Sequence, residues 1–286
     1  MIDHYFLNYG NTVFLDSQAP RLQYFSDSFL SQTEMPRPMH RHEDLFEISY
    51  VEEGSGRHFI DGRIYLSHPG DVMIYNRGVL HEDSAHEKNV VHMYGLGITN
   101  LHLDGMPDGC LLPSNSIMKI PCSLRAPQVH RLFLGIKEQV QRQKEVQAEV
   151  AAMFAASILL IVRELAIAQE HTEQTKEALL AQRICAYIDA NFSEELSLDS
   201  LQQEFSLSKY HIAHLFSRHI GYSPIQYLQR RRIGEAQSRL VFTDQKVIDI
   251  ALSVGFHSPS YFTRTFTKIV GMSPATYREI SSTSYN

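Results

Sequence analysis

The most constraining feature of this sequence is an internal repeat near its C-terminal end. Residues 208–227 align without gaps with residues 258–277, at a constant offset of 50 positions. Ser, Phe, Gly, Ser-Pro and Tyr coincide at positions 208, 216, 221, 223–224 and 227 of the first copy. Ser and Ser-Pro begin helices, Gly ends one in the left-handed conformation, and Phe fills a core. The repeat therefore predicts two copies of one small helical unit.

Each copy contains two short helices separated by a tight turn, the plan of a helix-turn-helix. In the second copy Gly255 stands in the turn, where a positive φ angle is needed. Ile212 and Phe216 in the first copy, like Phe262 and Phe266 in the second, are four residues apart, so they share one face of the helix and point inward. We therefore expect the opposite face of each second helix to be exposed.

This exposed face holds small, hydrogen-bonding and basic residues and no acidic residue. A plain solvated face would favour Glu and Lys, whereas this composition suits the DNA major groove, where side chains read base edges. Arg264 is the best single candidate for a base contact, because a guanidinium binds O6 and N7 of guanine together. The predicted base-reading residues are Tyr210, Ala213, His214, Ser217, Ser260, Thr263, Arg264 and Thr267.

Charge is distributed unevenly along the chain. Residues 1–179 hold 15 Lys and Arg against 23 Asp and Glu, whereas residues 180–286 hold 11 against 9. This asymmetry indicates that only the C-terminal part contacts a polyanion. For Arg232, an ion pair inside the domain is the alternative to a phosphate contact. The predicted phosphate contacts are Lys209, Arg218, Arg230, Arg231 and Lys268.

Residues 183–279 resemble the DNA-binding domain of the AraC/XylS bacterial transcription regulators, most specifically in the closing motif IALSVGFHSPSYFTRTFTKIVGMSPATYR. The resemblance implies two helix-turn-helix units joined by a long helix from Pro224 to about Leu240, with recognition helices entering successive major grooves about 34 Å apart. Two positions depart from the family pattern. Gln202 replaces a small Ala, and Ser206 replaces the usual turn Gly, at a cost of ~1 kcal/mol if it is left-handed.

The front of the chain has a different character. The pattern of residues 22–98 predicts short strands between tight turns, among them an Asp61-Gly62 hairpin. Turns spaced this closely favour an all-β barrel or sandwich. From Ala126 the apolar spacing becomes helical. We therefore predict an α+β protein of two domains: an N-terminal cupin-like β-barrel followed by helices, and a C-terminal all-α domain with two helix-turn-helix units. The predicted boundaries are 1–125 for an effector-sensing barrel, 126–170 for helices that pack on it and dimerise, 171–179 for a linker and 180–286 for the DNA-binding domain.

The barrel resembles the cupin-like sensor domain that often precedes this DNA-binding domain. Its first motif is carried by His40, His42, Glu47 and Gly54, and His81 takes the late histidine position of the second. In the second motif Asn76 and Ala85 depart from the usual Pro and Asn.

Three imidazoles and a carboxylate suit Mn, Fe, Ni or Zn, so His40, His42, Glu47 and His81 are candidate metal ligands. Strand alternation argues against this, since Glu47 falls on the other face from His42 unless the chain turns near Glu43-Asp44. A metal site, a metal-free effector pocket and purely structural histidines are the three alternatives. The predicted effector-binding residues are His40, His42, Tyr50, His81, His92 and Tyr94.

These features predict a sequence-specific DNA-binding transcription regulator, not an enzyme, controlled by a small-molecule effector in the barrel. The resemblance and a polar His/Tyr pocket favour a sugar, and no cofactor is required. The alternatives are a metal-dependent cupin oxygenase or isomerase fused to a DNA-binding tail, and a metal-sensing regulator. We expect the helices after Ala126 to relay the effector signal within a homodimer.

The expected partners are double-stranded DNA, the effector and, for an activator, RNA polymerase. The start of the chain lacks a signal-peptide pattern, and the longest apolar run, residues 150–162, is shorter than the ~20 residues that span a membrane. We therefore expect a bacterial cytoplasmic protein with no membrane partner, associated with the nucleoid when bound to DNA.

Overall fold

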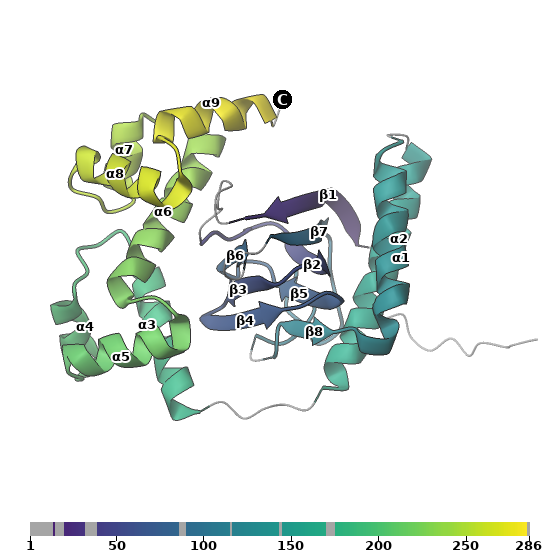
Figure 1. Ribbon diagram of the computed structural model, residues 1–286, viewed down its shortest axis with the longest axis horizontal. Helices are drawn as coiled ribbons and strands as arrows, with labels where there is room; N and C mark the ends of the chain where they lie inside the picture. Colours follow the sequence, from purple (N-terminus) through teal and green to yellow (C-terminus); the bar gives the residue numbers. More distant parts are fainter. Residues whose placement is uncertain are drawn as a thin grey trace, which may run out of the picture.

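The structure is a computed structural model that describes residue 14 and residues 20–31, 39–85, 90–114, 116–142, 145–169 and 175–284. Its N-terminal half is built of two antiparallel sheets, and its C-terminal half is helical (Figure 1). This is the α+β architecture of two parts that the sequence predicts. Residues 171–174 of the predicted linker lie outside the described residues.

The two sheets divide the eight described strands unequally. The five-stranded sheet has the order β1-β7-β2-β5-β8 and the three-stranded sheet the order β4-β3-β6. Asp61 and Gly62 both have positive φ angles, 47° and 74°, as a two-residue hairpin between β3 and β4 requires. The strand bounds are β1 Arg21–Leu30, β2 Phe46–Glu53, β3 Gly56–Ile60, β4 Arg63–Ser67, β5 Asp71–Tyr75, β6 His81–Ala85, β7 Val91–Thr99 and β8 Lys119–Pro121.

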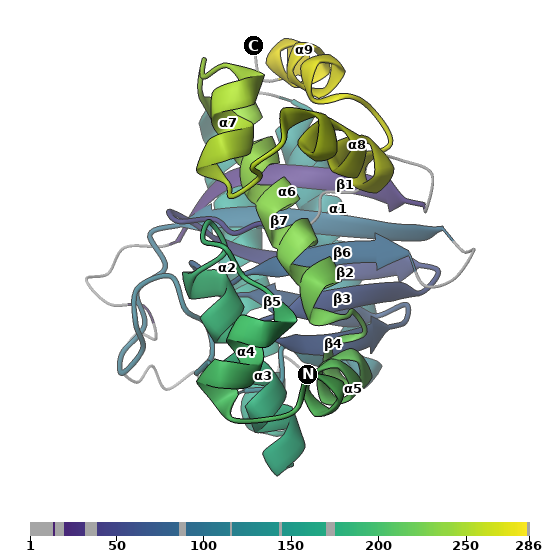
Figure 2. The same ribbon diagram turned by 90° about the vertical axis from the view of Figure 1, so that its left-hand side faces the viewer.

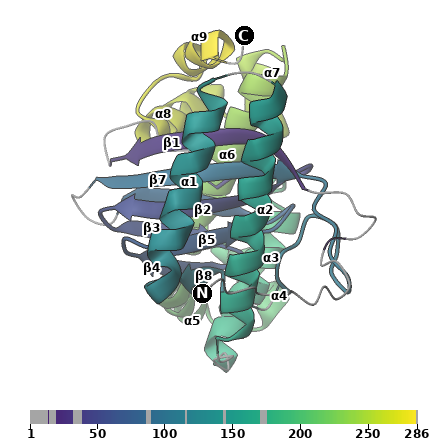
Figure 3. The same cartoon turned by 90° about the vertical axis from the view of Figure 1, so that its right-hand side faces the viewer.

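Helices α1 (Ala126–Val140) and α2 (Glu145–Ile167) follow a short 3₁₀ turn, η2 (Ser123–Arg125), and cover the outer face of the five-stranded sheet (Figure 3). Phe133 and Ile136 of α1 and Ile158 of α2 join the sheet residues in one buried core. By length and composition alone, residues Val146–Ile167 of α2 are long and apolar enough to cross a membrane. This stretch is longer than the apolar run of residues 150–162 that the sequence analysis considered. This helix nevertheless packs on α1, β1 and β8 along one side.

The C-terminal half contains two similar helical units that share α6. Phe216 and Tyr227 lie in the core of the first unit, and Phe262 and Phe266 in that of the second. In Figure 2, α5 and α8 lie toward opposite ends of α6. The helix bounds are α3 Lys176–Ala190, α4 Leu198–Phe205, α5 Lys209–Ile220, α6 Pro224–Phe242, α7 Val247–Ser253, α8 Pro259–Val270 and α9 Pro274–Ser284.

The helix caps follow the repeat. Ser208 Oγ accepts a hydrogen bond from the amide of His211, and Ser258 Oγ accepts one from the amide of Tyr261. Gly221 closes α5 with a φ angle of 74°, and its counterpart after α8 has a φ angle of 87°. The predicted caps, inward Phe residues and duplicated plan are therefore all observed.

The helical half packs against the barrel on the side of the three-stranded sheet, opposite to α1 and α2 (Figure 1). Met39, Phe59 and Leu80 of the barrel share a buried cluster with residues of α3, α5 and α6. The Phe59 and Tyr227 rings meet edge to face, with centroids 5.6 Å apart. Helix α6 thus contacts the barrel directly, and the expected relay through α1 and α2 stays a prediction.

Candidate functional site

Three histidines and one glutamate of the barrel converge on one point. His40 and His81 form an antiparallel bridge, with amide-to-carbonyl distances of 3.0 and 2.9 Å in the two directions. The chain bends at Glu43 and Asp44, where a turn is the condition for Glu47 to join the histidines, and this bend returns Glu47 to the side of His42. One ligand atom from each of the four residues His40, His42, Glu47 and His81 then lies within 4.8 Å of the other three.

The carboxylate of this cluster is held in its charged form. Glu47 Oε2 lies 3.0 Å from His42 Nε2 and 3.5 Å from His81 Nε2. Burial by itself raises the pKa of Glu47, but the hydrogen bonds from the two imidazoles outweigh it and hold that pKa well below its ordinary value. Burial lowers the pKa of His81, and the neighbouring Glu47 carboxylate more than reverses this, so the pKa is raised.

The donor set fits a divalent metal ion. Atoms that share an ion through bonds of about 2.1 Å lie about 3–4.2 Å apart, so these four side chains need only small movements to meet one. His81 Nδ1 lies 3.0 Å from the carbonyl oxygen of Val79, which orients the ring with Nε2 toward Glu47. His40, His42, Glu47 and His81 would hold the metal, which would supply a positive centre for an oxygen ligand.

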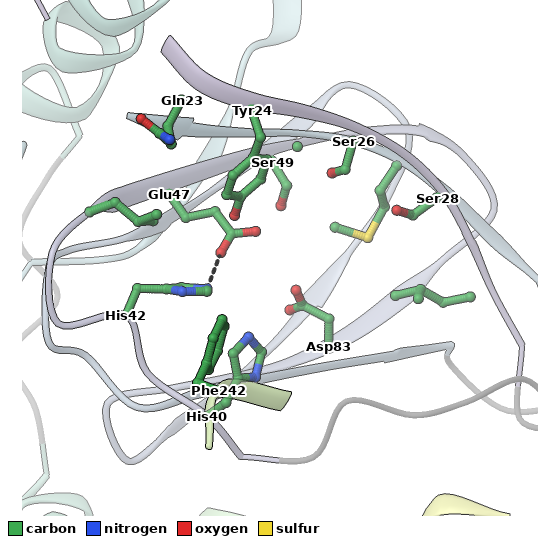
Figure 4. Close-up of a pocket in the computed structure, with 14 residues that line it drawn as sticks. Gln23, Tyr24, Ser26, Ser28, His40, His42, Glu47, Ser49, Asp83 and Phe242 are labelled. Carbon is green, nitrogen blue, oxygen red and sulfur yellow. Dashed lines mark ion pairs between the residues drawn. The ribbon is translucent and has the colours of Figure 1, made fainter. Parts of the chain in front are cut away.

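His40, His42 and Glu47 of this cluster line one side of a cavity of about 650 Å³ in the barrel (Figure 4). Gly95 and Gly97 of β7 leave room for two lining side chains of β1, because a Cβ at Gly95 would lie 2.4 Å from Ser26 Oγ and one at Gly97 would lie 2.1 Å from the Tyr24 ring. Hydroxyl, amide, imidazole and carboxyl groups stand among apolar side chains in the lining, which contains no Lys or Arg among the described residues. The lining residues are Gln23, Tyr24, Ser26, Ser28, Leu30, His40, His42, Leu45, Glu47, Ser49, Asp83, Met93, Gly95 and Phe242.

Asp83 carries the second carboxylate of the cavity and is fixed by buried partners. Its Oδ1 lies 2.7 Å from Nδ1 of the fully buried His58 and accepts a hydrogen bond of 2.7 Å from the Tyr75 hydroxyl. His58 Nε2 in turn lies 2.7 Å from Ser67 Oγ. This network leaves the Asp83 carboxyl group at a defined place on the cavity wall, where it can accept a hydrogen bond from a ligand hydroxyl.

Four of the six predicted effector-binding residues, Tyr50, His81, His92 and Tyr94, do not line the cavity. Tyr50 and Tyr94 face the opposite side of the sheet and stack near Phe133 of α1, with ring centroids 5.4 and 6.2 Å from it. His92 is on the same side, with Nε2 2.7 Å from Asp27 Oδ1. The reason is strand alternation, which sends Ser49 of β2 and the odd-numbered residues of β7 inward. His40 and His42 line the cavity, and His81 contacts Glu47 beside it.

Several cavity residues were missed by the sequence reasoning. Tyr24, Ser26, Ser28 and Leu30 alternate along β1, so they occupy one face of this strand. This two-residue spacing of short hydroxyl side chains is a signal that the sequence contains. Phe242 gives no such signal, because its position depends on how the helical half docks.

The predicted base-reading faces are exposed in both units. Seven of the eight residues are exposed and Ala213 is partly buried, while Phe216 and Phe266 on the opposite face are fully buried. Tyr210 is 81% exposed, and its ring stacks near that of His214 with a centroid distance of 6.1 Å. The exposed faces of α5 and α8 are therefore available for contact with DNA.

The predicted phosphate contacts divide into two groups. Lys209 pairs with Asp199 and Arg218 with Glu177 through exposed ion pairs, and exposed pairs of this kind are weak enough to exchange for phosphate. Lys268 is also exposed. The prediction for Arg230 and Arg231 is corrected. Arg230 contacts the barrel, and Arg231 is buried inside the helical half.

Arg230 Nη1 donates a hydrogen bond of 2.6 Å to Glu82 of the barrel, so its guanidinium is not directed to the outer surface. Arg231 is only 3% exposed, donates to Glu235 and lies over the Phe192 ring. Arg232 donates to the backbone oxygens of Phe192 and Glu194. Arg232 therefore makes contacts inside the domain, but with backbone carbonyl groups and not with the carboxylate of an ion pair.

Comparison with known proteins agrees with this arrangement. The family description "AraC-like ligand binding domain" matches residues 31–162, and "Helix-turn-helix domain" matches residues 201–280. The transcriptional activator AarP of Providencia stuartii is 35% identical over 122 residues, which are 43% of this chain and 88% of AarP. The chain belongs to the AraC family.

Two AraC-family relatives match nearly the whole chain. The uncharacterized regulator YdiP of Escherichia coli K12 is 26% identical over 281 residues, covering 97% of this chain and 92% of YdiP. The activator RhaS of Enterobacter sp. strain 638 is 29% identical over 253 residues, covering 85% and 87%. Both are named as HTH-type transcriptional regulators. The chain is thus an AraC-family transcriptional regulator with a ligand-binding domain and a DNA-binding helix-turn-helix domain.

Proposed function

We propose that this regulator responds to a neutral, hydroxyl-rich small molecule, such as a sugar, bound in the barrel cavity. The observation that carries the proposal is the lining. Ser, Tyr and Gln side chains and two carboxyl groups can bond hydroxyls, and the absence of Lys and Arg from the described lining disfavours an anion. No nucleophile or general base beyond the His/Glu cluster and Asp83 is evident among these residues, so we assign the barrel a sensing role and not a catalytic one.

The DNA-binding part of the proposal is tested with Arg264. Promoter fragments recovered by genome-wide mapping of bound DNA are titrated with wild-type protein, Arg264→Ala and the control Arg183→Ala, which alters an exposed Arg on α3. We expect the Arg264 variant to lose about 1–3 kcal/mol of specific binding, because it loses a base contact. The control should bind normally. An unchanged affinity and footprint for Arg264→Ala would overturn its assignment to the groove.

A metal-sensing regulator is the second candidate, favoured by the four ligand atoms that lie within 4.8 Å. We expect the wild-type chain to hold one Zn²⁺, Mn²⁺, Ni²⁺ or Fe²⁺ ion after equilibrium dialysis, measured by elemental analysis. His42→Ala and Glu47→Gln should bind at least about tenfold more weakly, because each removes a ligand. His92→Ala, which lies across the sheet, is the control. Wild-type protein without metal at micromolar free ion would end this candidate.

We also propose that the regulator is a cytoplasmic homodimer whose subunits meet through α2. Val146, Met153, Leu160 and Ile167 are exposed large hydrophobics spaced seven residues apart, which places them in one stripe along the helix. The same stripe on a second copy of the chain is the partner that best fits such a narrow, regular stripe. As two relatives are named activators, contact with RNA polymerase at the promoter is part of the same proposal.

A further inference from the structure

The last residue of α6 belongs to the wall of the effector cavity, although α6 is part of the DNA-binding half. Phe242 lines the cavity of about 650 Å³ together with His40 and His42, and Figure 4 draws its ring on the same side as His40. Phe242 also lines a neighbouring cavity of about 430 Å³ between α6 and the 40–45 segment. The cavity is therefore a composite of both halves of the molecule.

The N-terminal half of α6 and the turn before it are bound to the barrel. Arg230 donates to Glu82, which is only 3% exposed, and Arg57 donates from Nη1 to the Tyr222 hydroxyl at 3.1 Å and from Nη2 to the Ile220 carbonyl at 3.2 Å. Arg230 lies 12 residues before Phe242, or about 18 Å along the helix. Because a helix of this length is stiff, these contacts also fix where Phe242 stands at the cavity.

The two sides of the cavity offer different chemistry. The barrel offers the hydrogen-bonding groups of Ser26, Ser49 and Asp83 as well as apolar side chains. Phe242, a residue that is 68% exposed, adds an aromatic ring from α6. A sugar has the same division, because its hydroxyl groups project from the rim of a ring whose C–H bonds form an apolar face. An aromatic wall opposite polar groups is thus complementary to such a molecule.

We propose that the effector bridges the two halves of the protein, with its hydroxyl groups bound to the barrel and its apolar face packed on Phe242. This inference rests on the proposed function, because it assumes a hydroxyl-rich effector in this cavity. A ligand that contacts both halves binds more tightly when they are docked, so it stabilises the docked arrangement. The end of α6 is then the element that senses occupancy, without a relay through α1 and α2.

Calorimetry on the full chain tests the proposal, with a panel of hexoses, pentoses and their sugar alcohols as the probes. The variants are Phe242→Ala, Phe242→Tyr, the barrel variant Ser49→Ala and the control Ile248→Ala. Ile248 is an apolar residue of α7 with a similar exposure, 55%, and it does not line the cavity. Circular dichroism of each variant checks that the fold is kept before the sugars are titrated.

We expect the best sugar to bind Phe242→Ala about tenfold more weakly than wild type, because the contact with the ring is lost. Phe242→Tyr, which keeps the ring, and Ile248→Ala should bind as wild type does, while Ser49→Ala should bind more weakly. Normal binding to Phe242→Ala with weakened binding to Ser49→Ala would overturn the bridging role and leave the proposed function intact. A wild-type protein that binds none of the probes at millimolar concentration would overturn the effector class and the bridge together.

Discussion

Ser206 ends α4 in the left-handed conformation, with a φ angle of 54°. The corresponding turn of the second unit uses Gly255, with a φ angle of 91°. A side chain in this region costs about 1 kcal/mol, because its Cβ approaches the following carbonyl oxygen. The other departure from the family pattern is harmless, since Gln202 is exposed and needs no space in the core.

Ser206→Gly should raise the free energy of unfolding by about 0.5–1 kcal/mol. Removing the Cβ relieves the strain, and the greater freedom of Gly in the unfolded chain offsets part of this gain. Urea denaturation followed by circular dichroism measures the change. Ser217→Gly is the matched control, and it should lower stability because Ser217 is helical. A less stable Ser206→Gly protein would contradict the argument from backbone strain.

At the scale of elements, the helical half was the more predictable from sequence. Its caps, inward Phe residues and left-handed glycines are local features with a period of 3.6 residues, and the repeat presents each one twice. The four residues of the His/Glu cluster were named from the sequence, but strand alternation placed Glu47 on the other face from His42 unless the chain turned near Glu43 and Asp44. The structure contains this turn, which returns Glu47 to the side of His42 and brings the four ligand atoms together.

The rest of the candidate site depended on information that single elements do not carry. Tyr50, His92 and Tyr94 were misplaced because the inward face of a strand is set by its register with its neighbours. Arg230 is basic, so the sequence pattern favoured a phosphate contact. Its actual partner, Glu82, is 148 residues away and meets it only when the two halves dock.

The stripe of exposed hydrophobic residues on α2 predicts how two copies of the whole molecule associate. Leu160→Glu should convert the proposed dimer to a monomer, because two buried charges would face each other across the seam without partners. Sedimentation velocity measures the change. Leu252→Glu, at an exposed apolar position on α7, is the control and should stay dimeric. Equal sedimentation of Leu160→Glu and wild type would place the dimer contact elsewhere or exclude a dimer.

Helix α6 also limits what an effector can change in the operator. Its 19 residues form a rod of about 28 Å between the two units, close to one turn of B-DNA. Since α5 and α8 both pack on this rod, they move as one body. In the proposed homodimer, a bound effector can therefore reorient one subunit relative to the other or release it from the promoter, but the spacing of the two base segments that one subunit covers stays constant. Operators used with and without effector should share the same half-site length.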